Sequence, residues 1–190
     1  MKVGVLQEES ATIREAFRER GHDAISCDLL PSRRPGPHIQ GDVRAQDWRG
    51  FDLLICHPVC TRLCNSGVRW LAERNLWAEM DQACEDFNWF GGLPCDRIVR
   101  ENPIPHRYAR EKIGIYDQII QPWQFGDGET KATCLWLKGV APLVPTAIVG
   151  ERGASVHRCP PGPDRSRIRS TTFPGIARAM ADQWGGPPNG

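Results

Sequence analysis

Short apolar runs recur along the first hundred residues and are separated by polar segments. Five of these runs are typical of β-strands: residues 3–6, 24–27, 38–40, 51–56 and 97–100. Between the first two, residues 11–20 repeat apolar positions with helical spacing, with Ser10 as the expected N-cap and Gly21 just past the end. A strand, a helix and a second strand in this order predict a parallel sheet covered by helices.

The rest of the chain combines a long helical pattern with two further strands. Large apolar side chains recur at helical spacing between residues 70 and 89. Strands are expected at 118–121 and 133–137, and the glycine-containing turn between them favours an antiparallel pair. Residues 174–184 form the last expected helix. The pattern predicts a three-layer α/β fold, with a mostly parallel sheet and an antiparallel strand pair near the C-terminus.

The chain of 190 residues is expected to form a single domain over residues 1–185. Residues 140–163 are rich in proline and glycine and are typical of an irregular insertion, and residues 186–190 of a flexible tail. No run approaches the roughly 18 apolar residues that a membrane span needs. The apolar run at the start of the chain is too short for a signal peptide. We therefore expect a cytoplasmic protein with reduced cysteines.

The charges nearly cancel over the whole chain but cluster locally. The sequence has 24 Lys and Arg against 23 Asp and Glu, a net charge of +1, which argues against nucleic-acid binding by bulk positive charge. A local basic face remains compatible with these numbers. Arg165, Arg167 and Arg169 alternate, so they would face one side of an extended segment and would be placed to contact phosphates.

Polar residues follow the ends of successive predicted strands. In chain order these residues are Glu8 and Ser10, then Asp28, Asp42, Cys60, and Glu101 with Asn102. In an open parallel sheet, ligands bind at the carboxyl ends of the strands, and an acid after the second strand is placed to hold ribose hydroxyls. Each acid alone is equally typical of a turn, but the ordered set indicates a functional site at this edge.

The order of these motifs resembles that of the cytosine-C5 DNA methyltransferases, in particular the short versions of phages and prophages. Four segments carry the resemblance: Asp52 to Cys60 is similar to the strand and Pro-Pro-Cys loop, Glu101-Asn102-Pro103 to the Glu-Asn-Val motif, Gly41-Asp42-Val43 to the Gly-Asp-Ile motif, and Thr171 to Trp184 to the last conserved helix. The resemblance implies a three-layer Rossmann-like methyltransferase fold, S-adenosylmethionine as cofactor, and DNA in a bacterial or phage-infected cell as substrate.

The same resemblance implies roles for individual residues. Cys60 would be the nucleophile that adds to cytosine, and Glu101 the acid that holds the ring. The cofactor would contact Glu8, Ser10, Asp28, Leu29, Asp42, Val43 and Pro58. Substrate or phosphate would contact Arg62, Asn102, Lys131, Arg165, Arg167 and Arg169. A nucleophilic cysteine needs a lowered pKa, and a target base in duplex DNA would have to be flipped out of the stack.

Several positions depart from the family's pattern. The first loop, Leu6 to Ala11, lacks the glycines of Phe-x-Gly-x-Gly, and Val59 replaces a proline before the cysteine. Lys131 matches the Gln-x-Arg-x-Arg motif only loosely, and no segment is long enough for a separate target-recognition domain. Alternatives therefore stay open: a same-fold enzyme acting on single-stranded DNA or a free cytidine nucleotide, recognition through a separate subunit, or a non-catalytic binding module that has lost the cofactor.

The cysteines also allow two other interpretations. Cys56, His57, Cys60 and Cys64 form a Cys-His-x-x-Cys-x-x-x-Cys cluster of zinc-ligand types. Structural zinc sites usually pair two close couples, and no second Cys-x-x-Cys exists, so we expect no metal. The other interpretation is a small buried hydrophobic residue, the usual role of a free cysteine, which we expect for Cys27, Cys84 and Cys134.

Overall fold

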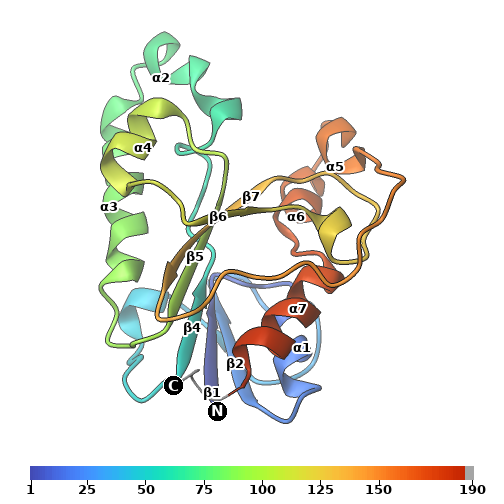
Figure 1. Cartoon of the computed structure of the whole chain (residues 1–190). Coiled ribbons are helices and arrows are strands. Elements are labelled where there is room, and N and C mark those ends of the chain that lie inside the picture. The colour runs from blue at the N-terminus through green and yellow to red at the C-terminus, as the bar shows by residue number, and fades with distance from the viewer. Residues whose placement is uncertain (187–190) are drawn as a thin grey trace.

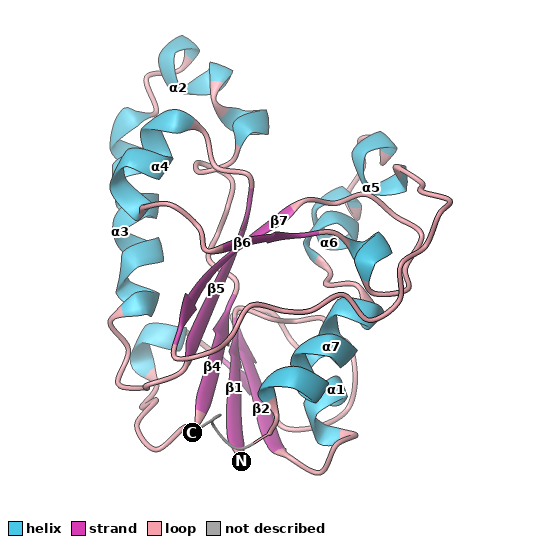
Figure 2. Ribbon diagram, in the orientation of Figure 1, coloured by secondary structure: helices cyan, strands magenta, loops and turns pink. Residues whose placement is uncertain are grey.

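The strands of the protein form one sheet with helices on both faces, in a computed structural model that describes residues 1–186 (Figures 1 and 2). The strands are β1 (Lys2–Leu6), β2 (Asp23–Asp28), β3 (His38–Gln40), β4 (Leu53–Cys56), β5 (Ile98–Pro103), β6 (Gln118–Ile120) and β7 (Thr133–Lys138). Their order in the sheet is β3-β2-β1-β4-β5-β7-β6. The first five are parallel, and β7 runs antiparallel to both β5 and β6. The predicted α/β fold with an antiparallel pair near the C-terminus is therefore confirmed.

Helices cover both faces of the sheet (Figure 1). On one face lie α1 (Thr12–Arg18) and α7 (Pro174–Trp184), and on the other lie α3 (Trp77–Gly91) and α4 (Arg107–Ile113). The short helices α2 (Arg69–Glu73), α5 (Ser155–Arg158) and α6 (Arg165–Ser170) and the 3-10 turns η1 (Val43–Ala45), η2 (Asn65–Gly67) and η3 (Pro122–Gln124) lie in the connections. None of the helices in residues 1–186 combines the length and the apolar character that crossing a membrane would need.

The buried apolar side chains fall into separate cores on the two faces of the sheet. Strand residues alternate between the faces, and Val3 and Val5 of β1 pack in one core with Ile176 and Met180 of α7. On the opposite face, further cores form under α3 and α4. The sheet order reverses direction between β1 and β4, and the crevice at such a switch point is where open α/β sheets bind ligands.

Arg14 of α1 is a fully buried arginine that holds the proline-rich loop after β2. Its guanidinium donates to the hydroxyls of Ser26 and Ser32 at 3.2 and 3.1 Å, and to the carbonyl oxygens of Arg34, Pro35 and Pro37 at 3.1, 2.8 and 3.2 Å. A loop with three prolines lacks the backbone donors to satisfy these carbonyls itself. The arginine therefore fixes the path that the chain takes from β2 to β3.

The sequence prediction was wrong in several local details. The helical pattern of 70–89 is divided by Asn75, whose φ of 51° ends α2 before α3 begins, and α4 was not predicted. The N-cap position of α1 is Ala11 rather than Ser10. Arg165, Arg167 and Arg169 lie in a helix rather than an extended segment, so they do not all face one side. Alternate residues share one face only where the backbone is extended, as in a β-strand. The expected tail, 186–190, lies outside the described residues except for Gly186.

Replacing Arg14 with alanine is expected to lower the free energy of unfolding by about 3 to 5 kcal/mol, because several buried acceptors lose their donor together. Urea denaturation measures this change. The control is Arg18→Ala in the same helix, since Arg18 is partly exposed and reaches Glu15 only at 4.0 Å. We expect that variant to change stability by less than about 0.5 kcal/mol. Equal losses in the two variants would contradict the role of Arg14.

Candidate functional site

The register of the parallel strands brings four polar residues to one level at the carboxyl edge. Leu6 of β1 pairs with Cys27 of β2 and with Cys56 of β4, and Cys56 pairs with Arg100 of β5. The next residue along each of these strands is Gln7, Asp28, His57 and Glu101, respectively. The structure thus brings together the strand-end positions that the sequence singled out, and it adds Gln7 and His57 to them.

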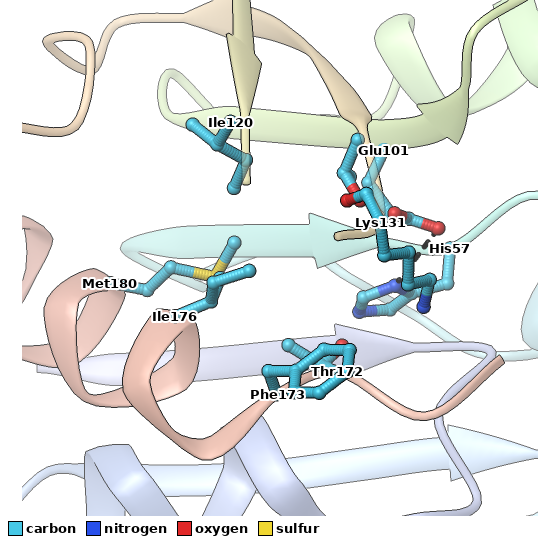
Figure 3. A pocket seen from close by; sticks show the side chains of 9 residues that line it. His57, Glu101, Ile120, Lys131, Thr172, Phe173, Ile176 and Met180 are labelled. Carbon is cyan, nitrogen blue, oxygen red and sulfur yellow. Dashed lines mark hydrogen bonds and ion pairs between the residues drawn. The ribbon is translucent and has the colours of Figure 1, made fainter. Parts of the chain in front are cut away.

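The centre of this edge is a carboxylate that lies between a histidine and a lysine side chain (Figure 3). Glu101 comes from β5, His57 directly follows β4, and Lys131 precedes β7. The Oε1 atom of Glu101 lies 3.7 Å from Nδ1 of His57. Burial alone would raise the pKa of Glu101, but the contact with His57 and the charge of Lys131 together lower it. Burial lowers the pKa of Lys131, although the charges of Glu101 and Cys60 oppose that shift.

Buried polar atoms without a partner gather at the same edge. Within residues 1–186 these include Nε2 of His57, Oε1 of Gln7 and Oδ1 of Asn102. A buried polar atom without a hydrogen bond costs about 1 to 3 kcal/mol, so such atoms are uncommon in folded proteins. Their concentration at the ends of β1, β4 and β5 indicates a place that a polar ligand completes.

A narrow cavity of about 10 Å³, with room for about one water molecule, lies beside the carboxylate (Figure 3). Its polar lining is His57, Glu101, Lys131, Thr133 and Thr172. Its apolar lining is Ile120 of β6 with Phe173, Ile176 and Met180 from the α7 segment. A few polar groups that converge against an apolar wall are typical of a ligand site, and a heterocyclic ring would enter only after these side chains move apart.

Cys60 lies in a turn that is tied to the continuation of β5. The backbone N–H groups of Leu63 and Cys64 both donate to the carbonyl oxygen of Cys60, at 2.9 and 3.1 Å. His106 accepts from Ala109 N–H through Nδ1 and donates through Nε2 to the carbonyl of Arg62 at 2.8 Å. His106, which caps α4, therefore also fixes the position of the turn that contains Cys60.

The structure places negative charge on Cys64 rather than on Cys60. A hydrogen bond given to Cys64, burial and the charge of Glu101 all raise the pKa of Cys60. The same hydrogen bond lowers the pKa of Cys64, and so do the hydroxyl and N–H of Ser66 and the N–H of Gly67, against an opposing effect of burial. The sulfur of Cys64 lies 3.0 Å from the Ser66 hydroxyl. The lowered pKa expected for Cys60 is thus found four residues later.

The residues expected around an adenosine group lie together after β2 and β3. One oxygen of Asp28 accepts from the Leu30 N–H at 2.9 Å, and Leu29 beside it is 69% exposed. Asp42 accepts from the Arg44 N–H at 2.9 Å and caps η1. Val43, by contrast, packs into the core under the edge, and Pro58 is buried in the Cys60 loop. A free carboxylate oxygen next to an exposed leucine fits a ribose with an adjacent ring.

The first loop is closed by its own side chains. The carboxylate of Glu8 accepts from the N–H groups of Ile13 and Arg14 at 2.7 and 3.3 Å and from the Ser10 hydroxyl at 3.1 Å, so Glu8 caps α1. Gln7 and Ala11 both adopt left-handed backbone conformations, with φ of 59° and 60°. Such conformations are strained in residues other than glycine and cluster at functional sites. Glu8 and Ser10 shape this loop, and Gln7 supplies its free acceptor.

A chain of polar contacts connects the first loop to the central carboxylate. Arg33 pairs with Glu9, and it donates to the Thr171 hydroxyl at 2.8 Å. Lys131 donates to the carbonyl oxygen of Thr171 at 3.2 Å. Arg33 and Thr171 are 138 residues apart in the sequence, and no local pattern marks either of them.

The remaining basic candidates divide into two groups. Arg169 lies close enough to Lys131 for its charge to lower the pKa of that lysine, and Arg165 is one helical turn away in α6. Arg62 instead pairs with Glu79 of α3 at 2.8 Å, and Arg167 faces Asp164 at 3.9 Å. Asn102 is fully buried, with its amide N–H donating to Pro103. Only the first group adds positive charge next to the site.

The zinc interpretation of the cysteines finds no support in residues 1–186. Cys56 is fully buried in the core between the sheet and α3. No three His, Cys, Asp or Glu side chains are grouped there in a way that would hold a metal ion. Cys27, Cys84 and Cys134 are buried, as expected, and burial raises the pKa of each thiol, to about 11, 11 and 12.

Comparisons with solved structures identify proteins with a similar fold. No family model and no curated protein matches the chain. It is similar to a solved structure named as a DNA modification methyltransferase encoded within an Escherichia coli prophage, with a TM-score of 0.50 and 13% identity over 78% of this chain and 52% of that one. An rRNA methylase from Escherichia coli is matched with a TM-score of 0.41 and 16% identity, over 72% and 56%. The chain spans about half the length of these structures. The first likeness confirms the methyltransferase fold.

The ultraviolet absorbance of thiolates should reveal one ionised cysteine near neutral pH. Cys64 has a lowered pKa, so its thiolate forms as the pH rises and is present at about pH 7, where an ordinary thiol with a pKa of about 8.5 is still protonated. We expect Cys64→Ala to remove this absorbance and Cys159→Ala, at a buried position in the α5 segment, to retain it. A signal that is lost in Cys60→Ala but retained in Cys64→Ala would contradict the assignment.

Proposed function

We propose that this chain is a methyltransferase that uses S-adenosylmethionine and methylates carbon 5 of cytosine in DNA. The observation that carries the proposal is the buried Glu101 carboxylate between His57 and Lys131, beside the Cys60 turn at the carboxyl edge of a methyltransferase fold. A carboxylate and a cysteine have distinct tasks in this reaction, and Cys60 lies close enough to Glu101 for the charge of the carboxylate to raise the pKa of the cysteine.

Glu101 and Lys131 would hold the cytosine ring. The Glu101 carboxylate, whose pKa is lowered by the contact with His57 and the charge of Lys131 against the effect of burial, accepts a hydrogen bond from the exocyclic amine of cytosine. Lys131 donates to the ring carbonyl oxygen, and His57 keeps Glu101 in place. Pulling electron density toward these polar groups makes carbon 6 of the ring more open to attack.

Cys60 would attack carbon 6. Its sulfur forms the new bond to that carbon, its proton passes to the neighbouring Cys64 sulfur, and the electron pair of the ring double bond moves to carbon 5. S-adenosylmethionine, when bound, supplies the methyl group for carbon 5. Because Cys60 is protonated at rest, the hydrogen bond to Cys64 gives its proton a direct acceptor.

The residues present fit that cofactor. Asp28 has a carboxylate oxygen free for ribose hydroxyls, and the exposed Leu29 offers a surface to the adenine. The unpartnered Oε1 of Gln7 is an acceptor for the amino group of the methionine part. Glu8 and Ser10 contribute through the shape of the first loop. The fit rests on buried polar atoms that only a ligand completes.

A free cytidine nucleotide or single-stranded DNA is the second candidate substrate. It is favoured by the small cavity and by the position of Arg169, whose charge acts on Lys131, whereas α6 is too short to form a long stripe for duplex phosphates. On this view residues 1–185 act as one catalytic domain. Duplex DNA would instead call for recognition by a separate subunit.

Nucleoside mass spectrometry tests the reaction. Purified protein with S-adenosylmethionine is incubated with duplex DNA, single-stranded DNA and dCMP, and 5-methylcytosine is expected in at least one sample. Cys60→Ala should reduce the product to below about one thousandth of wild type, since the variant lacks the sulfur that the proposal assigns to the bond with carbon 6. Cys159→Ala is the matched control and should retain activity. A methyl group on the exocyclic nitrogen, or no modified base in any sample, would contradict the proposal.

A further inference from the structure

Two of the eight cysteines are accessible from solvent, and they are neighbours. Cys60 and Cys64 are partly exposed, whereas the other six are buried. Both lie in the turn after β4, where the Cys64 N–H donates to the Cys60 carbonyl at 3.1 Å. A water-soluble oxidant therefore reaches this pair before any other thiol of the chain.

The two sulfur atoms are close enough to be joined after a small movement. They belong to one backbone turn, which the Cys64 N–H closes on the Cys60 carbonyl oxygen. Residues four apart in a helical turn have Cβ atoms about 5 to 6 Å apart, and a disulfide needs about 3.5 to 4.5 Å. The required closure of roughly 1 to 2 Å falls in an irregular segment between β4 and η2.

The surroundings of the pair give the two sulfurs unequal reactivity. Cys64 is surrounded by donors, namely the Ser66 hydroxyl at 3.0 Å and the N–H groups of Ser66 and Gly67. Cys60 has Glu101 nearby, which disfavours a second negative charge. An accessible thiolate beside a second thiol is the arrangement typical of cysteines that peroxides oxidise reversibly.

We propose that Cys60 and Cys64 form a site of reversible oxidation by peroxides, in which Cys64 reacts first and Cys60 closes a disulfide on it. The Cys64 thiolate attacks one oxygen of hydrogen peroxide, the O–O bond breaks, hydroxide leaves, and Cys64 becomes a sulfenic acid. The Cys60 sulfur then displaces hydroxide from that sulfenic acid, and the hydroxide takes the Cys60 proton as water. The two sulfurs lose two electrons in total, and the peroxide is reduced to one water and one hydroxide.

Oxidation of this pair occupies the residue that we propose as the nucleophile. In a disulfide the Cys60 sulfur is no longer a thiol or thiolate, so it cannot add to carbon 6. A thiol reductant restores both sulfurs. Methyl transfer would therefore stop under peroxide and resume after reduction, without loss of protein.

The sequence allows a direct readout of the bond. Arg62 lies between the two cysteines, so trypsin separates residues 50–62 from residues 63–69 in the reduced protein. After peroxide, blocking of free thiols and digestion, the two peptides are expected to stay linked through Cys60 and Cys64. Fragmentation distinguishes Cys60 from Cys56, which shares the first peptide. Dithiothreitol should separate the peptides again.

Variants test the order of events. In Cys60→Ala the reaction should stop at a sulfenic acid on Cys64, which dimedone traps. In Cys64→Ala we expect Cys60 to be oxidised at least about tenfold more slowly, because it lacks thiolate character. Cys159→Ala is the matched control and should cross-link like wild type.

Two results would overturn the proposal: both thiols remaining reduced under peroxide, or Cys64 oxidised without any link to Cys60, in protein whose circular dichroism shows that it is folded. The linked peptides form without cofactor or nucleic acid. Cross-linking in a protein that makes no 5-methylcytosine would therefore refute the proposed function alone, and methylation by a protein that never cross-links would refute the oxidation site alone.

Discussion

The partial burial of the Glu101 carboxylate is the constraint on which the site depends. A carboxylate shielded from water needs partners that offset the loss of hydration, and the fold supplies them from two other strands, through His57 after β4 and Lys131 before β7. Lys131 also holds Thr171, and Thr171 holds Arg33 of the loop after β2. One buried charge thereby connects the antiparallel end of the sheet with its parallel end.

The same edge shows how the first loop of this fold is built without the glycines of the family that the sequence resembles. Glu8 caps α1 from within the loop, and Gln7 and Ala11 adopt the left-handed conformations that glycine would take more easily. The strain is offset by the hydrogen bonds of Glu8 and by the buried Arg14 behind them. Side chains thus define the conformation of the loop, and the buried Oε1 of Gln7 at the end of β1 has no partner.

Sequence reasoning predicted what depends on local pattern. Strand ends in a parallel sheet must share an edge, so Asp28 and Glu101 could be assigned to one rim before their contacts were known, and the amphipathic period of 174–184 marked α7 correctly. It missed what depends on long-range packing, such as the Arg33–Thr171 contact. It also assigned the lowered pKa to Cys60, because the donors around Cys64 exist only once the turn has formed.

Isothermal titration calorimetry with S-adenosylmethionine tests the central claim most directly, because every proposed step requires that this edge bind the cofactor. The account predicts saturable binding with one site per chain, lost in Asp28→Ala and retained in Asp47→Ala, whose carboxylate pairs only with Arg49 on the surface. Absence of binding at millimolar cofactor, or equal binding by both variants, would contradict it.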